Sequence, residues 1–213
     1  MKYIISLFFL IAVSNGVHSL FSPLEIIGSV DRIPGVRVFS EMLRKNCHKD
    51  DTEFKEKIDN MQKCYLGLSG KETLCGIIRN HLRNCSQPVV DELEKCVEAR
   101  FHDLPQFAVE VIDSTADYLC KSKGEKIIEL LHPCLTSMGY RRGNVCLKSF
   151  KQKLENIEND TTSTNVKIDL CKSLETSKAC FLQEFKNICK NDVTMSAATG
   201  FYDAVITRPC KHV

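Results

Sequence analysis

Twelve cysteines constrain the fold of this chain more than any other feature of its sequence. They form two rows of six, which are Cys47, Cys64, Cys75, Cys85, Cys96 and Cys120, then Cys134, Cys146, Cys171, Cys180, Cys189 and Cys210. An even number of cysteines beyond a predicted leader indicates structural disulfides made in an oxidising compartment. We expect all twelve to be paired, each with a partner in its own row. Six cysteines allow fifteen connectivities, and the sequence does not choose among them.

The two rows resemble each other in local sequence and in spacing. Lys71-Glu-Thr-Leu-Cys75 in the first row reads like Lys167-Ile-Asp-Leu-Cys171 in the second. From that cysteine the next three follow at steps of 10, 11 and 24 residues in the first row, and of 9, 9 and 21 in the second. We therefore predict two related six-cysteine units, residues 47–120 and 121–213, packed as one body.

Residues 1–19 are typical of a secretory signal peptide. The apolar run 4–13 is too short to span a bilayer as a helix, and small residues follow it. We predict cleavage after Ser19, with Gly16 as the alternative, which leaves residues 20–46 as an N-terminal segment before the cysteine rows. No later stretch approaches the length of a membrane span, so the expected product is secreted, extracellular and without a transmembrane segment.

Composition narrows the possible partners. Apolar residues make up 43% of the chain, enough for a core of its own in addition to the disulfides. The formal net charge is only +2. A charge so nearly balanced argues against nucleic acid or an anionic membrane as the main partner.

Apolar residues recur at helical spacing along the chain without a convincing β-alternation, which predicts an all-α fold. In the first unit, four helices are expected at Asp51 to Gly67, after a Ser69–Glu72 capping box, after a Ser86 cap with Pro88 in the first turn, and after Asp103 with Pro105. In the second unit, we expect an apolar helix kinked at Pro133, then a turn at Gly139 to Gly143 and a helix from Leu147 to Ile157. A polar loop from Asn159 to Asn165 should follow. Two further helices are expected near Ile168 and Phe181, and a last helix is expected after a Thr194 cap.

Two sequons for N-glycosylation occur, Asn84-Cys-Ser86 and Asn159-Asp-Thr161. A glycan is bulky and has to lie on the surface. Asn159 is the stronger candidate because it begins a polar loop. Asn84 precedes a cysteine that we expect in a disulfide.

The sequence predicts no metal ligands, no cofactor and no catalytic residues. It has no Cys-x-x-Cys, no His-Glu-x-x-His and no Gly-x-Ser-x-Gly. His102-Asp103 is the nearest approach to a catalytic pair, since secreted phospholipases use a His-Asp pair. We interpret it as a histidine at a helix end followed by an N-cap aspartate.

Two local stretches carry a resemblance to a known family. They are the central Tyr118-Leu-Cys-Lys-Ser-Lys-Gly-Glu-Lys-Ile127 and the tail Ala197-Ala-Thr-Gly-Phe-Tyr-Asp-Ala-Val-Ile-Thr-Arg-Pro-Cys210. With the signal peptide and the helical cysteine ladder, they resemble the secreted 27 kDa haemolymph glycoproteins of insects, over Leu20 to Cys210. The resemblance implies an extracellular, glycosylated, α-helical protein of the body fluid, and it brings no active site to carry over. A nematode family of secreted cysteine-rich helical domains is the nearest competing resemblance.

The expected function is therefore that of a circulating, non-enzymatic glycoprotein that binds an extracellular protein of unknown identity. The alternative is a carrier of a small hydrophobic ligand or lipid, held in a pocket between the crosslinked helices. A secreted hydrolase is the third hypothesis. Insect odorant-binding proteins are also helical with six cysteines, but neither row here has their closely spaced second and third cysteines.

Overall fold

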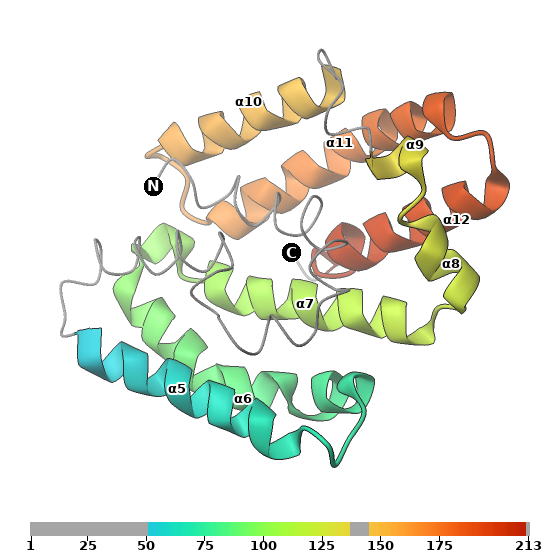
Figure 1. Cartoon of the computed structure of the whole chain (residues 1–213). Helices are drawn as coiled ribbons and strands as arrows, with labels where there is room; N and C mark the ends of the chain where they lie inside the picture. Colours follow the sequence, from blue (N-terminus) through green and yellow to red (C-terminus); the bar gives the residue numbers. More distant parts are fainter. Residues whose placement is uncertain (1–50, 137–144, 212–213) are drawn as a thin grey trace.

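The computed structural model describes residues 51–136 and 145–211, and within these ranges the chain is helical (Figure 1). The elements are α5 (Asp51–Leu68), α6 (Leu74–Cys96), η3 (Ala99–Phe101), α7 (Leu104–Lys121), α8 (Gly124–Glu129), α9 (Pro133–Thr136), α10 (Val145–Asn159), α11 (Val166–Ile188), α12 (Asp192–Tyr202) and η5 (Asp203–Thr207). The β-contact found in these ranges is one isolated bridge between Ser69 and Glu72. The predicted all-α fold is confirmed. The predicted signal peptide, the N-terminal segment 20–46, Cys47 and the predicted turn at 139–143 lie outside the described residues.

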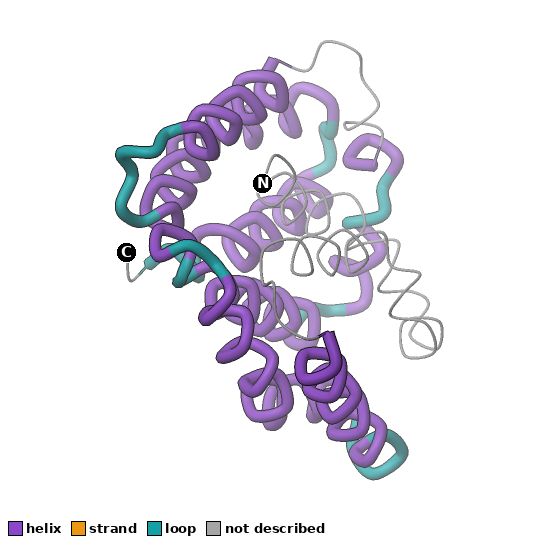
Figure 2. Tube along the Cα trace, turned by 90° about the vertical axis from the view of Figure 1, so that its left-hand side faces the viewer, coloured by secondary structure: helices purple, strands orange, loops and turns teal. Residues whose placement is uncertain are grey.

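Helix α7 lies at the centre of the described chain. Helix α6 packs along one side of α7, while η5 and α12 pack along the other. Helix α5 pairs with α6 at one end of the molecule, and α10 pairs with α11 at the opposite end (Figure 1). The view turned by 90° shows the same order, with the α5–α6 hairpin at the bottom and the α10–α11 pair at the top (Figure 2).

Helix α6 is one continuous helix, so the predictions of a Ser69 cap and of a new helix after Ser86 were wrong. Thr73 caps α6 instead, and its side-chain oxygen accepts a hydrogen bond from a backbone N–H in the first turn. Ser86 is buried inside the helix, where its hydroxyl lies 2.8 Å from the Tyr65 hydroxyl of α5. Pro88 lies within the helix as well. A proline there removes a single N–H donor, and the close packing of α5 and α7 along α6 offsets that loss.

The second half of the chain departs from the prediction at three more places. Helix α11, predicted as two helices, is continuous over 23 residues, because no glycine or proline interrupts it. Asn191, rather than Thr194, caps α12, and its Oδ1 accepts from the Val193 N–H at 2.7 Å. Thr194 lies one turn further and is fully buried. Pro133 begins the separate helix α9 rather than kinking a longer one.

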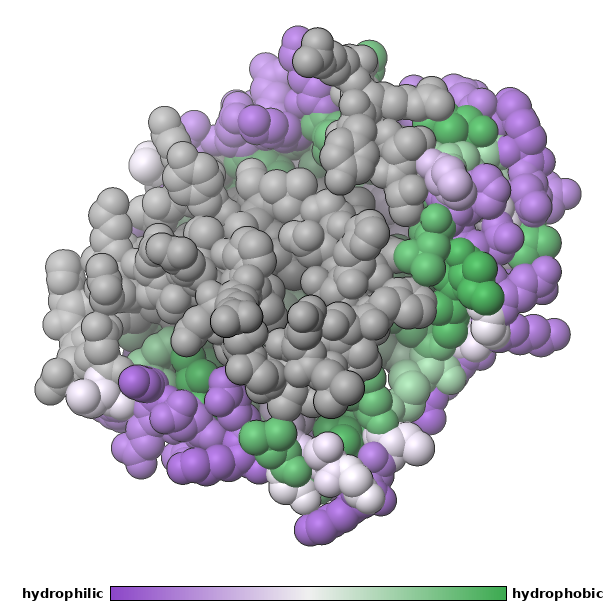
Figure 3. Space-filling view, viewed as in Figure 1, coloured by the Kyte–Doolittle hydropathy of each residue, from purple (hydrophilic) through white to green (hydrophobic). Residues whose placement is uncertain are grey.

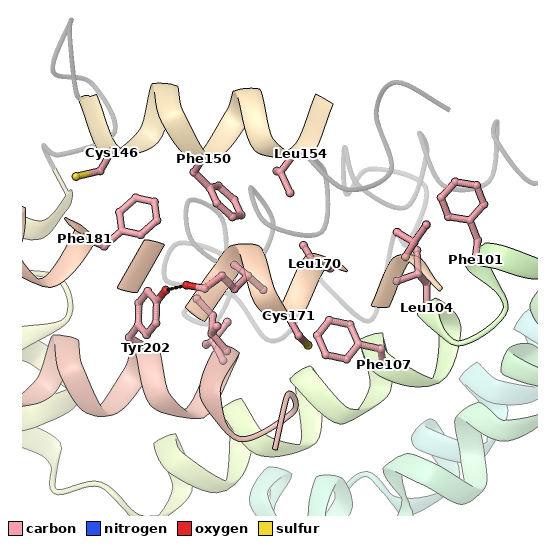
Figure 4. Close-up of a cluster of buried hydrophobic side chains, with 14 residues drawn as sticks. Phe101, Leu104, Phe107, Cys146, Phe150, Leu154, Leu170, Cys171, Phe181 and Tyr202 are labelled. Carbon is pink, nitrogen blue, oxygen red and sulfur yellow. Dashed lines mark hydrogen bonds between the residues drawn. The ribbon is translucent and has the colours of Figure 1, made fainter. Parts of the chain in front are cut away.

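The main hydrophobic core lies between α7, α10, α11 and the α12–η5 segment (Figure 4). At its centre, the rings of Phe150 and Phe181 meet edge to face with centroids 5.8 Å apart. Tyr202 packs beside Phe181, and its hydroxyl donates to the carbonyl of Leu174 at 2.8 Å. The other buried members are Phe101, Leu104, Phe107, Cys146, Leu154, Val166, Leu170, Cys171, Val205 and Ile206. Burial of each large side chain stabilises the fold by about 1.5–3 kcal/mol.

Two smaller clusters lie at the α5–α6 end of the molecule, one inside the α5–α6 hairpin and one between the hairpin and α7. Between α5 and α6, Val89 and Leu93 pack against the partly buried Phe54, Ile58 and Met61. Between α6 and α7, the buried residues are Leu82, Val90 and Val109, with Tyr65 and Ile78 at the edge. Apolar burial is therefore divided among three clusters, and it is much thinner at the α5–α6 end than in the main core.

Candidate functional site

Five disulfides are formed among the described cysteines, and each joins two different elements. The pairs are Cys64–Cys85 between α5 and α6, Cys75–Cys120 between α6 and α7, Cys134–Cys189 between α9 and the end of α11, Cys146–Cys180 between α10 and α11, and Cys171–Cys210 between α11 and the turn that follows η5. Cys96 is disulfide-bonded as well. In each of the five pairs, the two cysteines belong to the same row, as predicted. Cys47 lies outside the described residues.

The order of pairing is the same in the two rows wherever both can be read. The second cysteine joins the fourth, as in Cys64–Cys85 and Cys146–Cys180. The third joins the sixth, as in Cys75–Cys120 and Cys171–Cys210. In the second row the first cysteine also joins the fifth. The spacing of the cysteines alone could not select this order.

The two sequons lie in different surroundings. Asn159 is exposed at the last residue of α10, and Thr161 is exposed in the loop that follows. Asn84 is exposed on α6, but its neighbour Cys85 is bonded to Cys64, and Ser86 is buried. Both asparagines can therefore reach solvent in the folded protein, whereas the hydroxyl partner is accessible at Asn159 alone.

His102 and Asp103, at the junction of η3 and α7, are too far apart to form a hydrogen bond with each other. The His102 Nδ1 and the Asp103 Oδ1 are 4.0 Å apart, and both side chains are about half exposed. Asp103 occupies the N-cap position of α7, but its side chain makes no capping hydrogen bond. Its Oδ2 instead accepts from Asn165 Nδ2 at 2.6 Å. Since Asn165 caps α11, this carboxylate serves to hold the starts of α7 and α11 together.

One serine–lysine contact was not anticipated from the sequence. Lys153 on α10 donates to the hydroxyls of Thr176 at 2.9 Å and Ser177 at 3.3 Å, both on α11. A serine next to a lysine is a possible nucleophile and base. Ser177 is only 5% exposed, however, so a substrate cannot reach its hydroxyl, and the contact ties α10 to α11.

Two further buried polar contacts also join distant elements. Thr194 of α12 donates to the carboxylate of Glu129 on α8. Glu92, on the buried side of α6, accepts from Lys57 of α5 at 2.6 Å and from Lys95 at 3.2 Å. The hydrogen bond from Lys57, and to a smaller extent the one from Lys95, holds the pKa of Glu92 below its ordinary value. Nothing in the local sequence marks the contacts Thr194–Glu129 and Glu92–Lys57, because in each of them the two partners lie on different helices.

The described residues bring together no group of three or more His, Cys, Asp or Glu side chains that could hold a metal ion. None of the helices within 51–136 and 145–211 is both long and apolar enough to cross a membrane. Some large apolar side chains do face solvent, most of all Ile128 on α8 and Val145 at the start of α10, which are 67% and 71% exposed. Apolar surface gathers where α8 lies, at the right of the molecule in Figure 3.

A family model described as a protein of unknown function (DUF1397) matches residues 45–210. The match begins two residues before Cys47 and ends at Cys210, so it contains all twelve cysteines. A search of curated proteins and a search of solved structures each found no significant match. Because the model covers most of the sequence, the chain belongs to the DUF1397 family.

Proposed function

We propose that this protein is a secreted, glycosylated extracellular protein that acts by binding a partner and not by catalysis. The observation that carries the proposal is the disulfide framework, in which five bonds tie the described helices together. Disulfides of this number persist in oxidising compartments. The non-enzymatic role is supported by the geometry of His102 and Asp103 and by the burial of Ser177, described above.

Secretion is tested by expressing the full chain in insect cells and analysing the culture medium. We expect the protein in the medium without free thiols and with Leu20 as its first residue, or Val17 if cleavage follows Gly16. Intact mass under native and reducing conditions reports the disulfides. Retention inside the cell with most cysteines reduced would overturn the proposal.

Glycosylation is tested by Asn159→Gln and Asn84→Gln. We expect Asn159→Gln to remove a mass that an N-glycosidase also removes from the wild type, because Asn159 and Thr161 are both exposed. Asn84→Gln is the matched control and should leave most of that mass in place. A wild-type protein secreted without any N-glycan would contradict this part of the proposal.

We also propose that the chain is a haemolymph-type protein, as its resemblance to the insect 27 kDa glycoproteins implies. The shared order of pairing gives a test. If those glycoproteins are related to this chain, their cysteines should also join second to fourth and third to sixth within each row. Disulfide mapping of a purified haemolymph glycoprotein by non-reducing peptide mass spectrometry would show it, and any other order would argue against the relationship.

Duplication of one six-cysteine unit, residues 47–120 and 121–213, is proposed on the same basis. The pairs known in the first row leave Cys47 and Cys96, the first and fifth cysteines, which is the pair that Cys134–Cys189 makes in the second row. Cys96 is disulfide-bonded. We expect a Cys47–Cys96 peptide in a non-reducing digest. Cys47 linked to any other cysteine would break the correspondence between the rows.

Carriage of a small hydrophobic ligand is the second candidate. It is favoured by the border of the main core, where several apolar side chains are only partly buried, namely Val97, Val111, Ile157, Phe185, Ile188 and Phe201. Native mass spectrometry of protein purified from the medium tests the idea directly. A bound lipid of defined mass would support it, and repeated absence of any bound mass would exclude it.

A further inference from the structure

Cationic side chains from three parts of the chain meet at Asp117 on α7. The Lys121 Nζ lies 2.8 Å from the Asp117 Oδ1. The Arg208 Nη1, just beyond η5, lies 3.5 Å from Oδ2, and the Arg79 Nε of α6 lies 3.8 Å from Oδ1. Because α6 and η5 both pack on α7, residues that are far apart in the sequence surround one carboxylate.

A fourth cation extends this group along α6. Arg83 lies one turn after Arg79, and its Nη2 is 3.0 Å from the Asp113 Oδ2 of α7. Four residues of α-helix rise by about 6 Å. The two arginines therefore form a row along the seam between α6 and α7. We call Arg79, Arg83, Asp113, Asp117, Lys121 and Arg208 the Asp117 cluster.

The cluster carries more positive than negative charge. Its four cations face two carboxylates, so two positive charges are in excess, as many as the formal net charge of the whole chain. The cations are also the outer groups. Their side chains are 44–67% exposed, against 27% and 30% for the two aspartates. The carboxylate of Glu72, which precedes α6, is not counted in this balance because it is hydrogen-bonded to Asn80 and His81.

We propose that the Asp117 cluster binds a sulfated polysaccharide of the extracellular space. Arginine presents a planar fork of N–H donors that matches the oxygens of an anionic group such as sulfate. A row of exposed cations suits a linear polyanion, whose charges are spaced along a flexible chain. Two excess charges are too few to hold the protein on an anionic bilayer, because each contributes little at a membrane surface.

The choice of a polysaccharide rests on the proposed secretion, whereas the affinity for sulfate groups rests on the cluster alone. The probe is heparin, added to the full-length protein at 50 and 150 mM salt and followed by titration calorimetry. We expect binding that weakens as salt rises, since cations that meet a polyanion release its counterions. Arg79→Gln with Arg208→Gln should lower the affinity by about tenfold, because two of the contacts are lost. Asp117→Asn should raise it by several fold, since it removes the competing carboxylate.

Lys148→Gln with Lys151→Gln is the matched control. Both lysines are exposed on α10, so the change in net charge is the same at another place. We expect affinity for heparin to stay at the wild-type value, with thermal unfolding confirming that every variant is folded. An equal loss in the two double variants, or no binding by the wild type at 50 mM salt, would overturn the proposal.

Two further outcomes separate the inference from its premises. Vesicles containing 30% phosphatidylserine are the second probe, and binding to them as strong as to heparin would refute the choice of a polysaccharide. A protein that stays inside the cell but binds heparin through Arg79 and Arg208 would refute the proposed secretion and leave the anion site standing.

Discussion

The helices of the two cysteine rows follow the same order, and two disulfides join equivalent cysteines in both rows. We call α5, α6 and α7 the first-row helices, and α10, α11 and α12 with η5 the second-row helices. The long helices α6 and α11 both have 23 residues, and each packs against the helix before it. In each row one disulfide joins these two helices, and another joins the long helix to the end of the third element.

The two sets differ in what they bury. The second-row helices enclose the aromatic centre of the main core, with Phe150 only 1% exposed. The apolar cluster between the first-row helices α5 and α6 has only two buried residues, Val89 and Leu93. Helix α7 belongs to the first row by its cysteine, yet Leu104 and Phe107 pack into the main core. Similar crosslinks therefore accompany very different amounts of apolar burial. Because α7 packs into the main core, the stability of the first-row helices depends on the second-row helices.

The largest expected effect comes from the main core. Phe150→Ala should lower the free energy of unfolding by about 3–5 kcal/mol, because it leaves a cavity that its crosslinked neighbours cannot close. Leu93→Ala in the first-row seam should cost about 2 kcal/mol, the low end for such a change, because the partly buried side chains around it can relax. Urea unfolding at neutral pH measures both. If Leu93→Ala cost as much as Phe150→Ala, the two sets would not differ in packing as we describe.

Removal of a disulfide sharpens the same comparison. Cys64→Ser with Cys85→Ser should cost about 2–4 kcal/mol, since the bond constrains the unfolded chain. The loss should be local, because α5 is otherwise held by a small cluster. We expect hydrogen exchange to accelerate in α5 and to stay slow in α11. Cys146→Ser with Cys180→Ser is the counterpart in the second row. This double variant should accelerate hydrogen exchange in both α10 and α11. An acceleration that is confined to α10 would contradict a core shared by the two helices.

The contact between α7 and α12 should give a smaller effect. A Cβ at Gly200 would lie 2.7 Å from the Cε2 of Tyr118, whose hydroxyl is held by the carbonyl of Ala197 at 3.0 Å. Alanine favours a helix by about 1 kcal/mol, but overpacking costs about 1–3 kcal/mol. We expect Gly200→Ala to lower stability by about 1 kcal/mol, the balance of these two effects. In a Tyr118→Ala background the same change should become neutral or stabilising.

The sequence predicts the helical class well, because this class depends on the local spacing of apolar residues. The apolar repeat of Phe54, Ile58 and Met61 predicts α5, and Asp103 with Pro105 correctly predicts the start of α7. Helix breaks were predicted poorly at Ser86 and Thr194. Both residues are good caps in isolation, but each is buried in a hydrogen bond with another helix. Tertiary contacts therefore determine the roles of Ser86 and Thr194, and the local sequence pattern does not reveal such contacts.

The residues of the Asp117 cluster could not be identified from the sequence. Arg79, Asp117 and Arg208 are far apart along the chain and meet only because α6 and η5 pack on α7. A basic stretch is visible in a sequence when its cations are neighbours, and here they are not. The sequons are the opposite case. Asn84 and Asn159 are defined by three residues each, so their positions were predictable and only their surroundings required the structure.

The smallest expected effect concerns the seam between α5 and α6. Hydrogen bonds from Lys57 and Lys95 keep the pKa of Glu92 below its ordinary value in the folded protein. Since the folded state favours the ionised form, Glu92 stabilises the protein above the ordinary pKa of about 4.3, and this stabilisation is lost as pH falls through the lowered pKa. The wild type should therefore melt at a higher temperature than Glu92→Gln at pH 7, and this difference in melting temperature should narrow as the pH is lowered toward 3. Asp91→Asn, on the exposed side of α6, is the control and should not change the difference. A gap between wild type and Glu92→Gln that is as wide at pH 3 as at pH 7 would show that shape, and not charge, holds α5 to α6.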